Sequence, residues 1–273
     1  MAERPGLLFG RVAEEYERVR PSYPASLVDA ALSRAGAGAG DTVVEIGCGT
    51  GKLTRTLVER GVRVEAVEPD AEMIAVADRI VPEGSVRFHN AAFEAAELPE
   101  EAFPAVFAAT SFHWIDPSVG WSKVARLLRP GGVFALLTHT GGLRDGLDEE
   151  LVEIWRQATG GDWRPVDDEV LWAGAEARRD NISELWSWLC HHHELAVPEA
   201  AELFEDVEIA REPSEQDVPL EDYLARIRTT NNYLRMDAGT QQRLEQALTA
   251  VLQEHGGVYP SQTFATLVTA RRA

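Results

Sequence analysis

Short apolar runs alternate with amphipathic stretches from about residue 41 to residue 140. The runs have the length of buried strands, and the stretches between them carry apolar residues at the helical spacing of three and four. Strands that alternate with helices of about ten residues favour parallel crossovers and an open, doubly wound α/β sheet. The pattern predicts strands at 42–46, 63–67, 86–88, 105–109 and 133–137, and helices at 51–60, 71–79 and 118–128.

The pattern differs on both sides of this core. Prolines interrupt two helical stretches within residues 1–40, which predicts a helical lid. Residues 141–203 have long helical patterns, many tryptophans and no clear strand, which predicts a helical cap inserted after the fifth strand. Residues 204–273 are expected to complete a mostly parallel, seven-stranded sheet, with their two strands as an antiparallel edge pair. This last unit is predicted to contain strands at 204–210 and 263–270, and helices at 220–234 and 238–255.

Charge and cysteine content exclude several classes of protein. The formal net charge of −19 repels phosphate backbones and anionic membranes, so neither nucleic acid nor a membrane is an expected partner. Two cysteines cannot form a disulfide framework, and the first residues lack the basic and apolar regions of a secretion signal. We therefore expect a cytoplasmic protein that binds a small molecule. The sequence leaves its oligomeric state open, a homo-oligomer included.

A glycine-rich turn follows the first predicted strand. The apolar run 43–46 leads directly into Gly47, Gly49 and Gly51. Glycine permits a positive φ and lets a ligand approach the backbone, and the helix that follows offers free N–H groups. A dinucleotide-binding fingerprint would place its third glycine at position 52, where this chain has Lys52. The turn therefore favours an adenosine ligand other than NAD.

Two acidic residues accompany this turn. Glu68 ends the second predicted strand, where a carboxylate accepts the hydroxyl groups of a ribose, and the alternative is a solvated loop acid. Glu45 lies within the apolar first strand, where an acid is costly unless it has a cationic or hydrogen-bonding partner. The ammonium group of a ligand would supply that partner.

These motifs resemble those of the class I S-adenosylmethionine-dependent methyltransferases, in particular the bacterial small-molecule type. The similar segments are the glycine turn, Glu68 followed by Pro69 and Met73, and the run 127–132 before a strand. The resemblance implies S-adenosyl-L-methionine as cofactor, with its methionine part at the turn, its ribose on Glu68 and its adenine beside Pro69 and Met73. It also implies methyl transfer to a small molecule that is apolar, aromatic or anionic, with the late helices of 204–273 over the acceptor pocket.

Further contacts follow from the same resemblance. The family often has an acid after the third strand that meets the adenine amine, but this chain has Ala91 and Ala92 there. We therefore expect backbone groups of Ala92 and the ring of Phe93 to hold the adenine. Thr110, after the fourth strand, is expected near the amino-acid end of the cofactor, and Tyr16 is expected to close over it.

The acceptor side is expected after the fourth strand. Residues 111–116 resemble the Ser-Phe-His-Trp stretch of the branch that includes trans-aconitate and juvenile hormone acid methyltransferases. His113 is the candidate catalytic residue, as a proton acceptor, and the alternative is a structural histidine that bonds the cap. Trp114 is a candidate acceptor contact, with packing as the alternative. Arg228 and Asn232 share one predicted helix face and would orient a polar acceptor, with a solvated face as the alternative.

The run 191–194 contains three histidines and a glutamate, but we predict no metal site there. Adjacent histidines point in different directions, and only His191 with Glu194 has the spacing of helical metal ligands. A polar cluster at a helix end is the preferred interpretation. The cap tryptophans, Trp163 among them, are predicted to be mainly core residues.

Two other functions stay open at this stage. The same fold can hold a sulfonium as an electrostatic element for a cyclase or isomerase reaction, or bind an adenosine ligand as a noncatalytic sensor. Methyl transfer differs from both because the demethylated cofactor accumulates with the product.

Overall fold

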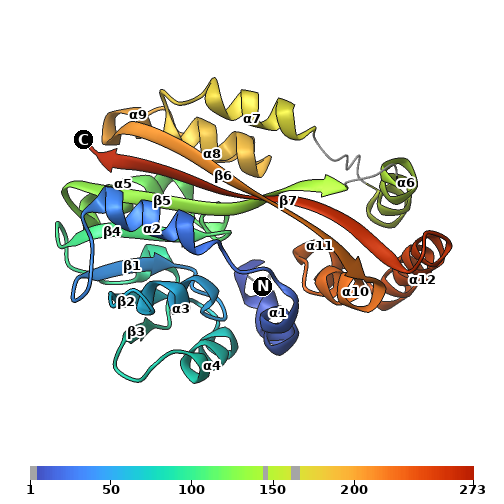
Figure 1. Cartoon of the computed structure of the whole chain (residues 1–273). Coiled ribbons are helices and arrows are strands. Elements are labelled where there is room, and N and C mark those ends of the chain that lie inside the picture. The colour runs from blue at the N-terminus through green and yellow to red at the C-terminus, as the bar shows by residue number, and fades with distance from the viewer. Residues whose placement is uncertain (1–4, 144–146, 161–166) are drawn as a thin grey trace.

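In the computed structural model, which describes residues 5–143, 147–160 and 167–273, seven strands form one sheet (Figure 1). Their spatial order is β3-β2-β1-β4-β5-β7-β6, and β7 runs antiparallel to both of its neighbours. The predicted mostly parallel, seven-stranded α/β sheet is therefore confirmed. The strands are β1 (Thr42–Ile46), β2 (Arg63–Val67), β3 (Val86–His89), β4 (Phe103–Ala109), β5 (Leu128–Leu143), β6 (Phe204–Pro219) and β7 (Val258–Arg272).

Helices cover both faces of the sheet, which explains why its central strands are almost wholly apolar. The helices α2 (Ala25–Ala35) and α3 (Lys52–Val58) pack on one face, and their buried leucines join β1, β2, β4 and β5 in one cluster. The other face is covered by α5 (Pro117–Leu127), α7 (Asp168–Glu176), α8 (Ile182–Cys190) and α9 (Ala200–Leu203).

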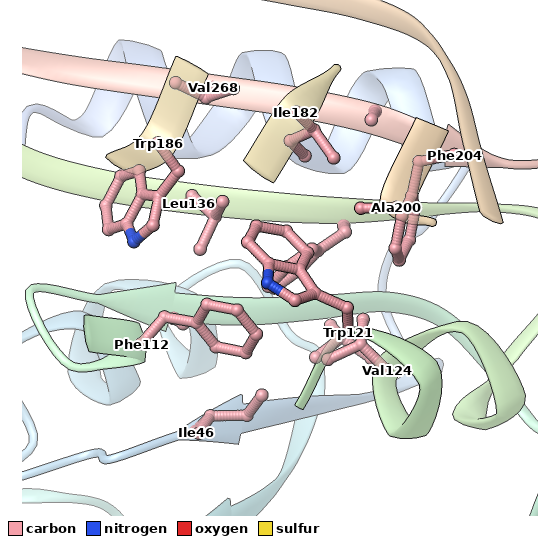
Figure 2. Packing of buried hydrophobic residues seen from close by; sticks show 14 of the residues in the cluster. Ile46, Phe112, Trp121, Val124, Leu136, Ile182, Trp186, Ala200, Phe204 and Val268 are labelled. Atoms are coloured by element: carbon pink, nitrogen blue, oxygen red, sulfur yellow. The ribbon is translucent and has the colours of Figure 1, made fainter. Parts of the chain in front are cut away.

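Aromatic side chains fill the second face (Figure 2). The ring of Trp121 lies edge-on to Phe112, with 4.8 Å between ring centroids, and Trp186 of α8 is fully buried nearby. Such rings bury large apolar areas and dominate the packing energy. The predicted core role of the cap tryptophans holds for Trp186, whereas Trp163 lies outside the described residues.

The predicted cap is not one unit. The helix α6 (Asp148–Thr159) packs against α12 (Ala238–Glu254) in a separate apolar cluster, whereas α7 and α8 lie on the sheet face. Figure 1 shows α6, α10 (Leu220–Arg228) and α12 beyond the right-hand ends of β5, β6 and β7. The expectation of a single cap over the strand ends is corrected, because the apolar faces of these helices bury against two different surfaces.

The late strands are longer than their apolar patterns. The β5–β7 ladder continues to Leu143 opposite Ser261, and β6 follows β7 to Pro219 opposite Val258. Much of β6 is exposed, and an exposed strand can carry polar residues. The alternation of apolar and polar residues therefore ends before the hydrogen-bonded ladder ends. The predicted helix 220–234 is also two elements, α10 and α11 (Asn231–Leu234), because the Thr230 side chain caps α11.

The N-terminal residues form a 3₁₀ helix, η1 (Pro5–Val12), and α1 (Ala13–Val19), which pack against α4 (Ala71–Ile80). The Gly10 N–H donates to Asp70 Oδ2 at 2.9 Å, directly after the end of β2. This segment therefore lies close to the carboxyl edge of the parallel strands, where open α/β sheets bind ligands. None of the described helices is long and apolar enough to cross a membrane.

Candidate cofactor and acceptor site

A cavity of about 740 Å³ lies at the carboxyl ends of β1, β2 and β4. Its wall combines the glycine turn, the residues after β2, β3 and β4, the end of β5, and the N-terminal segment. It contains all but three of the sequence-predicted site residues: Glu45, Gly47, Gly49, Glu68, Pro69, Met73, Ala92, Phe93, Thr110, His113, Trp114 and Tyr16.

The glycine turn serves two different purposes. Gly47 has φ +66°, and a Cβ there would lie 2.5 Å from Ser111 Cβ, so no larger residue fits. Gly49 lines the cavity with φ +54°. Gly51 does not line the cavity, and a Cβ there would lie 3.1 Å from Ala77 Cβ on α4. The expected cofactor contact of Gly51 is therefore replaced by a helix-packing role.

Glu68 is held at the end of β2 by two backbone groups. Its Oε2 accepts the Gly49 N–H and its Oε1 accepts the Asp70 N–H, both at 3.0 Å. The side chain is 6% exposed, and burial raises its pKa to about 7 although these hydrogen bonds oppose the shift. Each carboxylate oxygen keeps further acceptor capacity toward the cavity.

Glu45 is buried deeper than Glu68 and still lines the cavity. Its Oε2 accepts the Thr54 hydroxyl of α3 at 2.6 Å. Burial raises the pKa of Glu45 to about 8, and the nearby charge of Glu68 adds to the shift. A cation placed in the cavity would stabilise both ionised carboxylates.

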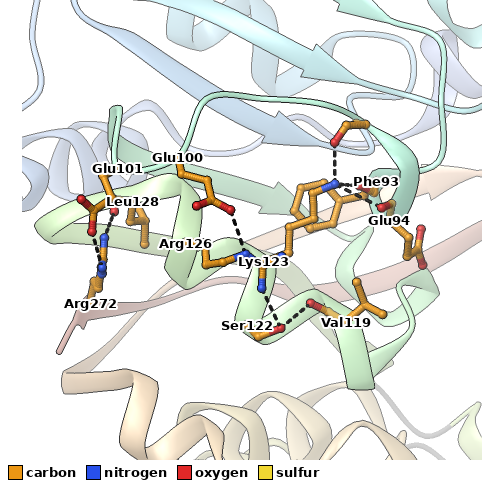
Figure 3. A network of polar contacts seen from close by, with 11 residues as sticks. Phe93, Glu94, Glu100, Glu101, Val119, Ser122, Lys123, Arg126, Leu128 and Arg272 are labelled. Carbon is orange, nitrogen blue, oxygen red and sulfur yellow. Dashed lines mark hydrogen bonds and ion pairs between the residues drawn. The ribbon is translucent and has the colours of Figure 1, made fainter.

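A lysine fixes the loop after β3 (Figure 3). The 3₁₀ turn η2 (Phe93–Ala95) lines the cavity together with Ala92. The ammonium of Lys123, on α5, donates to the carbonyls of Phe93 at 2.6 Å, Ala96 at 2.5 Å and Glu94 at 3.2 Å. Such charge-assisted bonds hold this part of the wall rigid without lining it.

The loop after β4 has a strained backbone and two aromatic side chains. Thr110 has φ +52°, which is uncommon for a β-branched residue and marks a functional loop. In the following turn η3 (Phe112–Trp114), the ring of His113 stacks on His192, with 5.5 Å between centroids. Burial, helped by His192, lowers the pKa of His113 to about 4, so its ring is neutral at neutral pH. Trp114 lies edge-on to Phe9 at 6.2 Å.

The lid contributes residues that the sequence analysis did not single out. Tyr23 lies 2.6 Å from Thr110, hydroxyl to hydroxyl, and its ring is 4.7 Å from the ring of His139 on β5. The guanidinium of Arg20 lies 5.3 Å from the ring centroid of Tyr16. Arg20, Tyr23 and His139 all line the cavity. The predicted strand ends at residue 137, so His139 falls just outside the apolar pattern.

Arg228 and Asn232 lie outside the cavity, and their predicted acceptor contact is corrected. Arg228 is paired with Glu245 of α12, with its Nη2 2.8 Å from Oε2. Asn232 is exposed on α11, because the break at Thr229 and Thr230 separates it from the helix of Arg228. Thr230 and Asn231 line the cavity instead.

The histidine cluster ends α8. His191 has φ +56° and terminates the helix, and His192 Nδ1 lies 2.8 Å from Glu194 Oε1. Within the described part of the chain, no group of three or more metal-ligating side chains is present.

Known proteins match the core of this site. Residues 44–136 match the family model of a methyltransferase domain. An uncharacterised methyltransferase of Mycobacterium bovis is 41% identical over 164 residues, which are 60% of this chain and 63% of that protein. The methyltransferase CRG1 of Saccharomyces cerevisiae is 33% identical over 125 residues, 44% of this chain and 43% of that protein. The match thus spans less than two thirds of the length of these relatives.

Solved structures agree on the fold. A protein of Anaeromyxobacter dehalogenans, assigned as a type II methyltransferase, superposes with a TM-score of 0.60 at 24% identity, over 93% of this chain and 97% of that chain. Residues 44–136 therefore resemble a methyltransferase domain in sequence, and the chain shares the fold of the Anaeromyxobacter protein. The narrower resemblance to the trans-aconitate and juvenile hormone acid branch stays a prediction.

The cavity fits S-adenosyl-L-methionine, the cofactor that the sequence resemblance implies. Gly47 and Gly49 present backbone without side chains at the turn, where a ligand must approach closely. Glu68 has acceptor capacity for ribose hydroxyls, and the buried carboxyl of Glu45 lacks a cationic partner among the described residues. An ammonium or sulfonium group would supply that missing charge.

Proposed function

We propose that this protein is a cytoplasmic enzyme that transfers a methyl group from S-adenosylmethionine to a small-molecule acceptor. The observation that carries the proposal is the pairing of the glycine turn with Glu68 at the wall of one large cavity. The cofactor binds along this wall, with its ribose on Glu68, its adenine between Met73 and Phe93, and its amino-acid end near Thr110. Tyr16 covers it from the lid.

The chemistry asks little of the protein beyond alignment. S-adenosylmethionine supplies a methyl group that is already electrophilic. The protein has to hold the acceptor atom in line at about 3–3.5 Å and to exclude water. A lid of η1 and α1 and a wall anchored by Lys123 serve these two requirements.

The acceptor occupies the part of the cavity between the loop after β4 and the lid. His113, Trp114 and Phe9 give that part an aromatic lining. An apolar or aromatic acceptor fits such a surface, because stacked or edge-on rings add to the energy of burial. His113 is predicted to accept a proton, with a structural role as the alternative, and His113→Ala distinguishes the two.

Binding of S-adenosylhomocysteine, measured by isothermal titration calorimetry, tests the proposal. Wild type should bind it, and Glu68→Ala should weaken binding at least about tenfold, because removing an acceptor of charge-assisted hydrogen bonds costs roughly 1.5–3 kcal/mol. The matched control is Glu72→Ala, an exposed carboxylate on α4 close by. Absence of binding by wild type, or equal binding by Glu68→Ala, contradicts the proposed cofactor site.

Methyl-labelled cofactor tests the reaction itself. Incubation with a deproteinised bacterial metabolite extract should move label into another small molecule, with one S-adenosylhomocysteine formed per product. A product formed without S-adenosylhomocysteine would favour the cyclase alternative, and no product at all would favour the sensor.

A further inference from the structure

A second histidine lies in the cavity, in an otherwise apolar part of the sheet. His139 lies two residues after Leu137 on β5. Leu137 pairs with Ala109 of β4, so His139 lies beside the loop of Thr110. Alternate residues of this strand, Val133, Ala135 and Leu137, pack on the face covered by α2. Because side chains alternate along a strand, His139 points to the same face as Leu137. It is not part of the apolar cluster on that face, and its ring lines the cavity.

The lid fixes the orientation of this ring. The backbone of Ser22 forms a hydrogen bond with the imidazole that favours protonation, which identifies the partner as a carbonyl that accepts a ring N–H. Tyr23 covers the ring at 4.7 Å with 30° between the planes. A neutral imidazole with one N–H donated to a carbonyl has a lone pair on its other nitrogen.

The surroundings keep His139 neutral. Burial, opposed by the Ser22 hydrogen bond and helped by the charges of Arg20 and Arg226, lowers its pKa to about 4. The phenol of Tyr23 is itself neutral, because burial raises its pKa far above the usual value. The hydroxyl of Tyr23 forms a hydrogen bond with the Thr110 hydroxyl, with 2.6 Å between the oxygens. The ring of His139 is therefore an acceptor of hydrogen bonds at neutral pH.

We propose that His139 accepts the proton of the methyl acceptor, and that this acceptor carries a hydroxyl group at the reacting atom. The inference rests on the proposed methyl transfer. In this step the acceptor oxygen bonds to the methyl carbon, and the carbon–sulfur bond breaks with its electron pair going to sulfur. As the new bond forms, the hydroxyl proton moves to the free ring nitrogen of His139, and from there it moves to water.

A weak base suffices for this reaction. The proton of a neutral hydroxyl is held firmly before attack, and it becomes strongly acidic as the oxygen gains a third substituent in the transition state. Arg20 and Arg226 then favour its prompt loss from the imidazolium to solvent, which restores the neutral ring. His113 differs, because its ring stacks on His192 and lies 4.7 Å from the ring of Trp114. None of the described residues forms a hydrogen bond that would orient this ring.

Label transfer to a deproteinised bacterial metabolite extract tests this assignment. His139→Ala should lower the rate at least about 100-fold, the usual contribution of a general base, while its affinity for S-adenosylhomocysteine stays within about threefold of wild type. Added imidazole should restore part of the lost rate in His139→Ala and none in His113→Ala. The matched control, His255→Ala, changes an exposed histidine at the end of α12 and should leave the rate unchanged.

The outcomes separate the two proposals. Transfer by His139→Ala within about threefold of wild type, or a loss that imidazole does not rescue, overturns the role of His139 and leaves the proposed function standing. No transfer by wild type contradicts the proposed function, and the role of His139 fails with it. A rate that falls through lost cofactor binding is recognised by calorimetry and also overturns the assignment.

Discussion

Glu45 and Glu68 are two carboxyl groups buried at one cavity, and burial raises the pKa of both. Hydrogen bonds from Thr54 to Glu45, and from Gly49 and Asp70 to Glu68, hold both side chains in these positions. Buried ionisable groups with displaced pKa values concentrate at functional sites, since a ligand of opposite charge removes the cost. These two residues therefore provide the sharpest tests of the site.

Cofactor affinity should depend on pH through Glu68. Ribose hydroxyls donate to the ionised carboxylate, whereas the free protein holds a proton on Glu68 below its pKa of about 7. Binding below that pH must release the proton, which costs up to about tenfold in affinity per pH unit. The Kd of S-adenosylhomocysteine, measured by calorimetry, should therefore fall on the order of tenfold from pH 6 to pH 8. Glu68→Gln should flatten this dependence, and an equally steep profile in that variant would contradict the assignment.

Cofactor affinity should rise with pH through Glu68, whereas the free energy of unfolding should fall with pH through Glu45. The pKa of Glu45 is raised from 4.5 to about 8 in the folded state, so this carboxyl ionises at a lower pH in the unfolded chain than in the folded protein. The wild type therefore loses stability as pH rises from about 4.5 toward 8. Glu45→Gln has no such loss, because an amide oxygen can still accept the Thr54 hydroxyl. Its free energy of unfolding, relative to wild type, should rise by ~1–4 kcal/mol between pH 5 and pH 9 in urea titrations. Glu59→Gln, an exposed control at the C-terminal end of α3, should show no trend.

Gly51, at the start of α3, packs closely against Ala77 of α4. Gly51 → Ala should destabilise the protein for two reasons: φ is +85°, and the new Cβ would lie 3.1 Å from Ala77 Cβ. Gly84→Ala is the matched control, because φ is +77° with nothing within 4 Å of its Cβ. The first variant should therefore lose at least ~1 kcal/mol more than the second in chemical denaturation, the usual cost of overpacking. Equal losses would mean that backbone strain alone fixes this glycine.

Local sequence patterns predicted the elements of the core better than those at its margins. β1 and β2 match their predicted bounds, because buried parallel strands are short apolar runs with sharp ends. The long ladder of β5, β6 and β7 was missed beyond its apolar part, because partner strands supply its hydrogen bonds whatever the side chains are. The predicted helix 220–234 failed for a related reason, since a cap at Thr230 interrupts a continuous amphipathic pattern.

Across the molecule, the lid connects distant parts of the chain. Arg20 donates to the side chain and the carbonyl of Thr229, at 2.9 and 2.8 Å, and Glu17 accepts the Thr50 hydroxyl at 2.6 Å. Ligand binding in the cavity should stabilise η1 and α1, because Phe9 and Tyr16 line it. Hydrogen–deuterium exchange should slow in both segments with saturating S-adenosylhomocysteine, while α12 stays unchanged. Unaltered exchange in η1 and α1 would contradict a lid function.

The amino-acid sequence by itself determined the short strands of the sheet core, the glycine turn and the position of Glu68 at the end of β2, because each depends on neighbours within a few residues. Only the tertiary structure decided that Gly51 packs a helix, that Arg228 pairs with Glu245, and that α6 and α8 cover different surfaces. It also decided that His139 meets Ser22 and Tyr23 at the cavity. These contacts join residues far apart in the chain, and no local periodicity encodes which buried surfaces meet.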